Sequence, residues 1–320
     1  MIDRRLSSCV VVTMIAALNA CSATAPATGT DDEDVGAGEG EGEGEGEGED
    51  IGGEGEGEGE GESFVSVCTG SADEVDCPYR TVAIDPGFGF GEREVHVAVP
   101  GGEAPPTGWP TVIFFQGSLY SAELSFHGEE GDALGQFELA KTVKALLDDG
   151  FAVIAPEVIA AGTTFWQTNV PPVAYFWAGS SDDNLMEQLF AEIDDVDGAF
   201  GHLDAERLFA TGISSGGFMT SRMAVSYPGR FKALAVHSGG YALCSAVCVL
   251  PPSMPEDHPP TLFVHGLADL VVTPGIMMMY RDALDDDGVE VDTVVGEHEA
   301  HEWIGAAVTE IPAWFSAHLD

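Results

Sequence analysis

The chain has 320 residues, of which 55 are acidic and 11 are Lys or Arg, so its formal net charge at pH 7 is −44. Apolar residues make up 44% of the sequence, which is enough for a sizeable core. So acidic a chain has no means of neutralising phosphates, which argues against nucleic acid as a partner and favours saline surroundings that screen the repulsion between like charges.

The first 20 residues are typical of an export signal. Arg4 and Arg5 precede an apolar run over residues 10–18, and small residues follow. This run is too short to cross a bilayer as a helix. We therefore interpret residues 1–20 as a signal peptide that directs export.

The sequence at the end of this signal, Leu18-Asn19-Ala20-Cys21, resembles the lipobox of bacterial lipoproteins. The resemblance implies that Cys21 receives a lipid, becomes the mature N-terminus and anchors the protein to a membrane. Ser22 after the cysteine implies the outer membrane or cell surface of a Gram-negative bacterium. A plain signal peptide followed by a chance cysteine is the alternative.

Residues 21–62 are predicted to comprise the lipidated cysteine and a disordered tether behind it. Gly and Glu alternate almost without a break over residues 38–62. Glycine gives the backbone maximal freedom and the like charges repel, so an extended, solvated spacer is expected. Cation binding is the alternative, although alternating glycine offers a hard cation no fixed ligand geometry.

The cysteines that remain after Cys9 and Cys21 are even in number: Cys68, Cys77, Cys244 and Cys248. In an exported chain such cysteines are expected to form two disulfides. Three connectivities are open, of which the local pairs 68–77 and 244–248 are the simplest. A zinc site is the rival interpretation, but the spacings are not those of a CxxC pair, and we expect no metal.

Residues 63–320 are predicted to form one α/β domain, because strand patterns alternate with helix patterns along it. In such a domain a mostly parallel sheet carries helices on both faces, and ligands bind beyond the carboxyl ends of the strands. In chain order we expect strands at 93–99 and 111–116, a helix from about Asp132, a strand at 151–155, a helix capped by Ser181, a strand at 207–213, a helix at 215–227, strands at 231–236 and 262–264, a helix at 276–284, a strand at 289–295 and a helix at 301–319.

The run Gly212-Ile213-Ser214-Ser215-Gly216 lies at one predicted strand-to-helix junction. This G-x-S-x-G pattern is typical of a nucleophile elbow, whose turn is so tight that small residues must flank the serine. Ser214 is therefore the candidate nucleophile, and the helix that follows points backbone N–H groups at developing negative charge.

A serine nucleophile needs a base and an orienting acid, which in this topology follow it in the order acid, then histidine. Asp269 ends the loop His265-Gly266-Leu267-Ala268-Asp269 after a strand, which favours it as the acid over an ordinary surface aspartate. For the base we favour His301, at the start of the last predicted helix, over His298. These two histidines do not have the i, i+4 spacing of an HExxH zinc site.

The loop after an early strand, Phe115-Gln116-Gly117-Ser118-Leu119, is the expected source of the second oxyanion donor. We expect the backbone N–H groups of Ser118 and Ser215 to bind the oxyanion. Leu119 replaces Ser118 if the register differs by one residue.

The segment from Asp204 to Gly240, with HGLAD at 265–269 and HEW at 301–303, resembles the poly(3-hydroxybutyrate) depolymerase and feruloyl/acetylxylan esterase family. The resemblance covers about residues 80–320 and implies the α/β-hydrolase fold and ester hydrolysis through an acyl-enzyme, without a cofactor. Gln116 stands where this family usually has His, and Ser215 where depolymerases often have Asn.

The sequence thus predicts an exported serine esterase whose substrates are hydroxybutyrate oligomers, feruloyl or acetyl esters or other short-chain esters. Two alternatives stay open. A serine peptidase of the same fold would share Ser214, Asp269 and His301. A non-catalytic surface binding protein is less consistent with the presence of all three in order.

Overall fold

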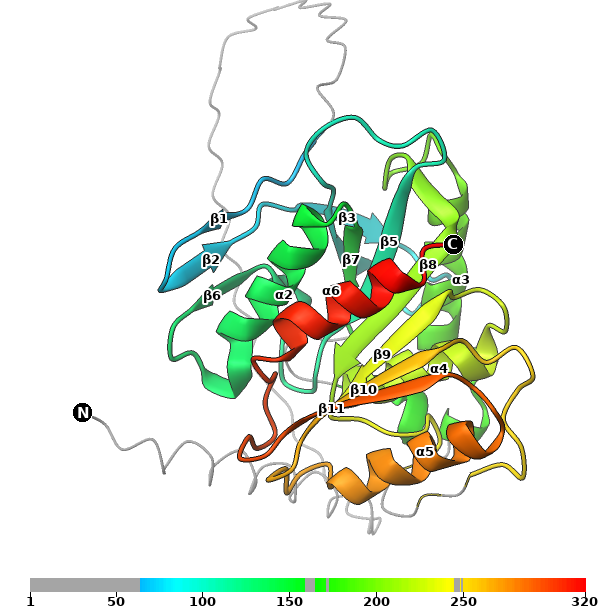
Figure 1. Cartoon of the computed structure of the whole chain (residues 1–320). Coiled ribbons are helices and arrows are strands. Elements are labelled where there is room, and N and C mark those ends of the chain that lie inside the picture. Colours follow the sequence, from blue (N-terminus) through cyan, green and yellow to red (C-terminus); the bar gives the residue numbers. More distant parts are fainter. Residues whose placement is uncertain (1–63, 159–164, 171–172, 245–247, 249) are drawn as a thin grey trace, which may run out of the picture. The chain divides into compact units, whose positions relative to one another are not determined.

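The computed structural model describes residues 64–158, 165–170, 173–244, 248 and 250–320 (Figure 1). The chain divides into two units, Met1–Glu62 and Ser63–Asp320. The predicted signal peptide, Cys21 and the tether therefore lie outside the described residues, and the folded unit is considered by itself.

An eight-stranded sheet forms the centre of the folded unit, in the order β11-β10-β9-β8-β5-β7-β4-β3. All neighbours from β7 through β5 to β11 pair in parallel, whereas β4 pairs antiparallel with both β7 and β3. The predicted mostly parallel sheet is confirmed. The strands are β3 (Arg80–Ile84), β4 (Arg93–Ala98), β5 (Trp109–Phe115), β7 (Ala152–Pro156), β8 (Leu203–Ile213), β9 (Ala233–His237), β10 (Thr261–Gly266) and β11 (Val291–Gly296).

Helices cover both faces of this sheet. Along β5, Val112 and Phe114 join the core under α2 and α6, whereas Ile113 and Phe115 join the core under α3 and α4. Successive side chains of a strand point to opposite faces, so β5 is buried on both sides, as its continuous apolar run predicts. The helices are α2 (Gln136–Asp148), α3 (Ser181–Asp194), α4 (Ser215–Ser226), α5 (Pro274–Asp286) and α6 (Ala307–Ala317).

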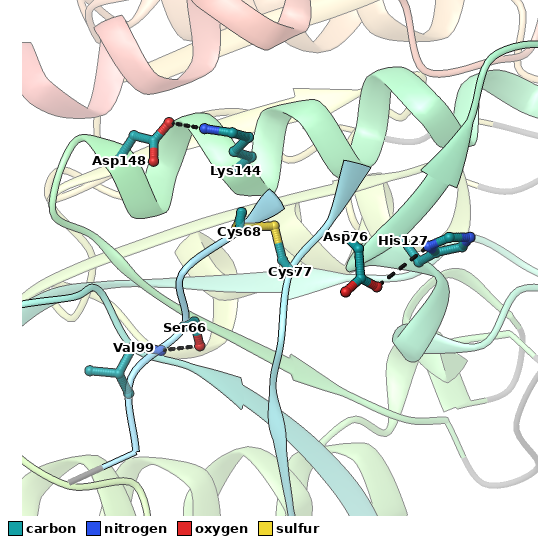
Figure 2. Close-up of a disulfide and its surroundings, with 8 residues drawn as sticks. All are labelled: Ser66, Cys68, Asp76, Cys77, Val99, His127, Lys144 and Asp148. Atoms are coloured by element: carbon teal, nitrogen blue, oxygen red, sulfur yellow. Dashed lines mark hydrogen bonds and ion pairs between the residues drawn. A yellow bond between two sulfur atoms is a disulfide. The ribbon is translucent and has the colours of Figure 1, made fainter. Parts of the chain in front are cut away.

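A second, three-stranded antiparallel sheet was not predicted from the sequence. It consists of β1 (Thr69–Gly70), β2 (Glu74–Asp76) and β6 (His127–Glu129), and the Cys68–Cys77 disulfide closes its hairpin (Figure 2). A Cβ atom on Gly128 would lie 2.7 Å from Phe137 Cα, so the sheet packs directly on α2. Strands of two or three residues carry no detectable periodicity, which is why the sequence did not reveal them.

The second disulfide joins Cys244 and Cys248, so the structure contains the two local pairs. Short 3₁₀ helices complete the described elements: η1 (Ala122–Ser125), η2 (Ala133–Gly135), η3 (Gln167–Asn169) and η4 (Val173–Tyr175). No helix among the described residues has both the length and the apolar composition needed to cross a membrane.

Two predicted helix ends were wrong. The N-cap of α3 is Ser180, whose side chain accepts a hydrogen bond from the Asp183 N–H, and not Ser181, whose hydroxyl accepts one from Arg93 instead. The last helix begins at Ala307 rather than His301. Trp303 and Ile304 lie in a loop, yet both side chains are buried. Their positions in the sequence therefore resemble the apolar spacing of a longer helix.

Candidate active site

Ser214 stands at the junction of β8 and α4 in a strained conformation, with φ 57° and ψ −118°. A non-glycine residue adopts positive φ only where its surroundings hold it there, and such strain gathers at functional sites. The Ser214 N–H donates to the His237 carbonyl at 3.1 Å, and the Ser214 carbonyl accepts from the Phe218 N–H at 3.0 Å. The turn is thus fixed on both sides of the serine.

The glycines around Ser214 are required by close backbone contacts. A Cβ atom would lie 2.4 Å from the Phe115 carbonyl oxygen if placed on Gly212, and 2.0 Å from it if placed on Gly216. On Gly217 it would lie 2.5 Å from the His237 carbonyl oxygen. The backbones of β5 and β9 therefore close on the turn from both sides, which is the physical reason for the G-x-S-x-G spacing.

Asp269 and His301, the predicted acid and base, meet at the carboxyl edge of the sheet. His301 Nδ1 lies 2.7 Å from Asp269 Oδ2, and Asp269 Oδ1 accepts from the Val271 and Val272 N–H groups at 2.8 and 2.9 Å. A carboxylate partner fixes the proton of the imidazole on Nδ1 and leaves Nε2 as an acceptor. His298 is exposed, so the geometry favours His301.

The Asp269 carboxyl is 1% exposed, and burial alone would raise its pKa. Hydrogen bonds from His265, His301 and the Val271 N–H outweigh the burial, so its pKa lies well below the ordinary value. His265 Nε2 donates to the Val272 carbonyl at 2.8 Å and lies 3.4 Å from Asp269 Oδ2. His265 thus supports the acid from inside the fold.

The loop after β5 lies against the serine turn. A Cβ atom on Gly117 would be 3.8 Å from Ser214 Cβ, and Gly117 begins a turn in which Leu119 has φ 68°. Among the described residues, the N–H groups of Ser118 and Ser215 donate to no protein atom. These two N–H groups, which the sequence predicts as oxyanion donors, therefore have no protein acceptor in the described part of the chain.

Trp166 donates hydrogen bonds both to the serine turn and to the loop after β5. Its backbone N–H donates to Ser215 Oγ at 2.9 Å, and its indole N–H donates to the Gln116 carbonyl at 3.1 Å. Both Trp166 and Trp177 are buried. Both side chains are therefore packed inside the fold and do not form the wall of an open pocket.

Two buried arginines hold the segment that carries Trp166. Arg93 pairs with Asp182 at 2.6 Å, and the Gln167 N–H donates to the other oxygen of Asp182. Arg222 of α4 donates to the hydroxyl and carbonyl of Thr168, both at 2.9 Å. Burial lowers the pKa of Arg222 to about 10, so it remains charged at neutral pH.

Several large exposed hydrophobic side chains lie in loops at this edge of the sheet, a feature that the sequence did not reveal. β4 runs antiparallel to β7, so the β3–β4 loop opens at the same edge as the loops that leave β5, β7 and β10. We call this set of side chains the apolar rim. It comprises Phe88, Phe90, Leu119, Phe165, Tyr175, Phe176, Leu267 and Leu270.

Side chains close enough together to bind a metal ion occur elsewhere in the fold, on the small sheet. Among the described residues, one group of three qualifies, Glu74, His127 and Glu129 on the small sheet. These side chains are exposed or half-buried, and His127 is also 3.5 Å from Asp76 (Figure 2). None of them belongs to the edge that carries Ser214.

Comparison with known proteins gives three kinds of match. Residues 177–249 match the model of the prolyl oligopeptidase family. The chain is 44% identical over 247 residues to the poly(3-hydroxyoctanoate) depolymerase of Pseudomonas fluorescens, covering 77% of this chain and 86% of that one. It is 32% identical over 99 residues to feruloyl esterase B of Thermothelomyces thermophilus, covering 31% of this chain and 32% of that one.

The fold resembles that of a thermostable esterase of known structure, with a TM-score of 0.53 and 18% identity. The likeness covers 76% of this chain and 63% of that one. At this identity it bears on the fold alone, and the architecture is that of an α/β hydrolase.

Replacing Gly216 by Ala should damage both folding and activity, because the new Cβ meets the Phe115 carbonyl at 2.0 Å. Overpacking of this kind costs about 1–3 kcal/mol, and relaxation would move the serine turn. Gly275→Ala is the matched control, since nothing lies within 4 Å of its Cβ position. Urea unfolding midpoints measure the effect, and equal midpoints for the two variants would contradict the packing described.

Proposed function

Since the chain belongs to the esterase and depolymerase family of α/β hydrolases, we propose that it cleaves carboxylic esters through an acyl-enzyme formed on Ser214. The observation that carries the proposal is the 2.7 Å contact between His301 and the buried carboxylate of Asp269. It supports a base whose proton is held on Nδ1 and whose Nε2 is free for the serine.

In the proposed reaction, Ser214 Oγ attacks the ester carbonyl while His301 Nε2 takes its proton. The oxyanion accepts hydrogen bonds from the Ser118 and Ser215 N–H groups, which supports the tetrahedral intermediate. Its collapse breaks the bond to the alcohol oxygen, which leaves with the proton from His301. Water, deprotonated by His301, then attacks the acyl-enzyme, and the acid product leaves with Ser214 restored.

A serine peptidase of this fold would use the same three side chains, and the match to the prolyl oligopeptidase family favours that alternative. The match spans residues 177–249 and so contains Ser214 but neither Asp269 nor His301. The relative that is 44% identical is a depolymerase of a polyester. Ester hydrolysis is therefore the better supported activity, and an amide substrate belongs in the same assay.

For the substrate we propose polyesters or oligoesters of 3-hydroxy acids with apolar side chains. Phe88 is 88% exposed, Leu270 is 84% exposed and Phe176 is 73% exposed, and all three belong to the apolar rim. Exposed apolar patches around a site are typical of surfaces that bind an apolar partner. The name of the P. fluorescens relative, a poly(3-hydroxyoctanoate) depolymerase, supports the same substrate class.

For localisation we propose export and attachment to the outer membrane or cell surface of a Gram-negative bacterium through a lipid on Cys21. The lipobox-like residues 18–21 and the Gly/Glu run behind them support this proposal. An acidic tether would hold the domain off an anionic membrane surface and let the apolar rim reach insoluble polymer.

Ser214→Ala and His301→Gln should each lower kcat/KM for p-nitrophenyl octanoate by at least about 10⁴-fold, because each removes one member of a catalytic unit. His298→Gln is the matched control and should retain activity, since His298 is exposed. A p-nitroanilide of the same acyl group tests the peptidase alternative. Undiminished ester turnover by the Ser214 variant would refute the mechanism.

Replacing Phe88 and Phe176 together by Ser should weaken adsorption to films of poly(3-hydroxyoctanoate) by at least about tenfold, because each side chain offers apolar area to the polymer. The control is Val67→Ser with Val196→Ser, which removes two exposed apolar side chains near the opposite edge of the sheet. Depletion of protein from solution measures adsorption, and urea midpoints verify folding. Equal adsorption by both double variants would rule out the rim as the polymer-binding surface.

Cys21→Ala should move the protein from the membrane fraction to the soluble exported fraction, because the lipid attachment site is lost. Cys9→Ala, within the predicted signal, is the control and should stay with the membrane. Immunoblots of separated fractions give the distribution. A Cys21 variant that remains membrane-bound would count against lipid anchoring while leaving the esterase proposal intact.

A further inference from the structure

His237, the last residue of β9, contacts both segments that carry the proposed reaction. Its backbone carbonyl accepts the Ser214 N–H at 3.1 Å, and its ring Nε2 accepts the Ile304 N–H at 3.1 Å. The side chain is fully buried. One residue therefore links the serine turn to the loop of the base, three residues beyond His301.

These contacts define the state of the ring. Because the Ile304 N–H is a donor, Nε2 must offer a lone pair, so the proton of a neutral ring lies on Nδ1. Nδ1 is 3.2 Å from Ser238 Oγ, which accepts that proton's hydrogen bond. Protonation would remove the lone pair of Nε2, so the Nε2–H and Ile304 N–H groups would face each other without an acceptor.

Trp303 gives the ring its packing surface. The His237 and Trp303 rings are stacked, with centroids 4.4 Å apart and planes at 12°. Trp303 is itself fixed, since its backbone N–H donates to the Leu134 carbonyl and its indole N–H donates to Thr142 Oγ1, both at 2.9 Å. The loop beyond His301 is thus anchored to the core through Trp303, and His237 connects Trp303 to the sheet.

The titratable groups that face His237 are His265 on β10, Asp269 in the loop after β10 and His301 in the loop after β11. Burial lowers the pKa of His237 well below its ordinary value, and His265 and His301 lower it further against the opposing effect of Asp269. Because the unfolded chain takes up this proton more readily than the folded one, protonation of the histidine favours unfolding. The fold therefore keeps its full stability above the ordinary pKa of about 6.5 and loses stability as the pH falls below that value. The ring is therefore neutral where the enzyme would act.

We propose that His237 is a positioning residue for ester hydrolysis, whose neutral imidazole holds the His301 loop in register with the Ser214 turn. This inference rests on the proposed function, because it requires Ser214 and His301 to have the roles proposed for them. It assigns no chemistry to His237 itself. The residue touches neither substrate nor reacting atoms. It acts by keeping the base within reach of the nucleophile, where an error of about 1 Å costs about 10²-fold in rate.

Two substitutions separate the hydrogen bond from the packing. His237→Phe keeps a ring to stack on Trp303 but has no acceptor, whereas His237→Gln places an amide oxygen near the position of Nε2. We expect His237→Phe to lower kcat by about 10²-fold with little change in KM, and His237→Gln to keep most of the turnover. His258→Phe, which removes another buried histidine that is bonded to Tyr280, controls for the general cost of such a change and should leave kcat unchanged.

Hydrogen exchange supplies a readout that does not depend on activity. The Ile304 amide should exchange faster in His237→Phe than in the wild type, and His237→Gln should retain its protection. In the wild type that protection should fall on acidification as the ring is protonated, and His237→Gln should lose less of it because glutamine does not titrate. This comparison decides the matter if His237→Phe fails to fold.

Unchanged kcat in a folded His237→Phe variant, or the same acid-dependent loss of Ile304 protection in wild type and His237→Gln, would overturn the inference. Persistent turnover in Ser214→Ala would instead overturn the proposed function. The Ile304 exchange result would still stand in that case, so the two failures are distinguishable.

Discussion

The carboxylate of Asp269 is buried, and an unpaired charge in that position would cost far more than a small domain can sustain. Its oxygens are therefore surrounded by donors: two backbone N–H groups from its own loop, with His265 and His301 beside them. These partners come from β10 and from the loop after β11, so pairing this one charge fixes two chain segments. The position of His301 follows from that requirement, and the availability of its Nε2 follows from the proton held on Nδ1.

The protein combines a large negative charge with exposed apolar side chains. The chain carries a net charge of −44, and charges of one sign repel other copies of the chain. The edge that bears the site nevertheless exposes several large apolar side chains, including Phe88 and Leu270. Like charges oppose self-association, while the apolar rim offers the surface that we propose for an apolar substrate.

Most of the architecture could be predicted because it is local in the sequence. The buried strands, the glycines around Ser214 and the order of Ser214, Asp269 and His301 all depend on short patterns. The start of the last helix was predicted wrongly, because Trp303 is buried from a loop by contacts with distant residues. The His237–Ile304 bond and the apolar rim were missed for the same reason, since they join residues that only the tertiary structure brings together.

The measurement that tests the central claim most directly is covalent labelling with an alkyl fluorophosphonate, followed by mass spectrometry of the intact protein and of its peptides. An activated serine beside an oxyanion site displaces fluoride and retains the phosphonyl group. We predict a single adduct on Ser214, formed quickly in the wild type and very slowly in His301→Gln. Labelling spread over several serines, or undiminished by loss of His301, would contradict the account.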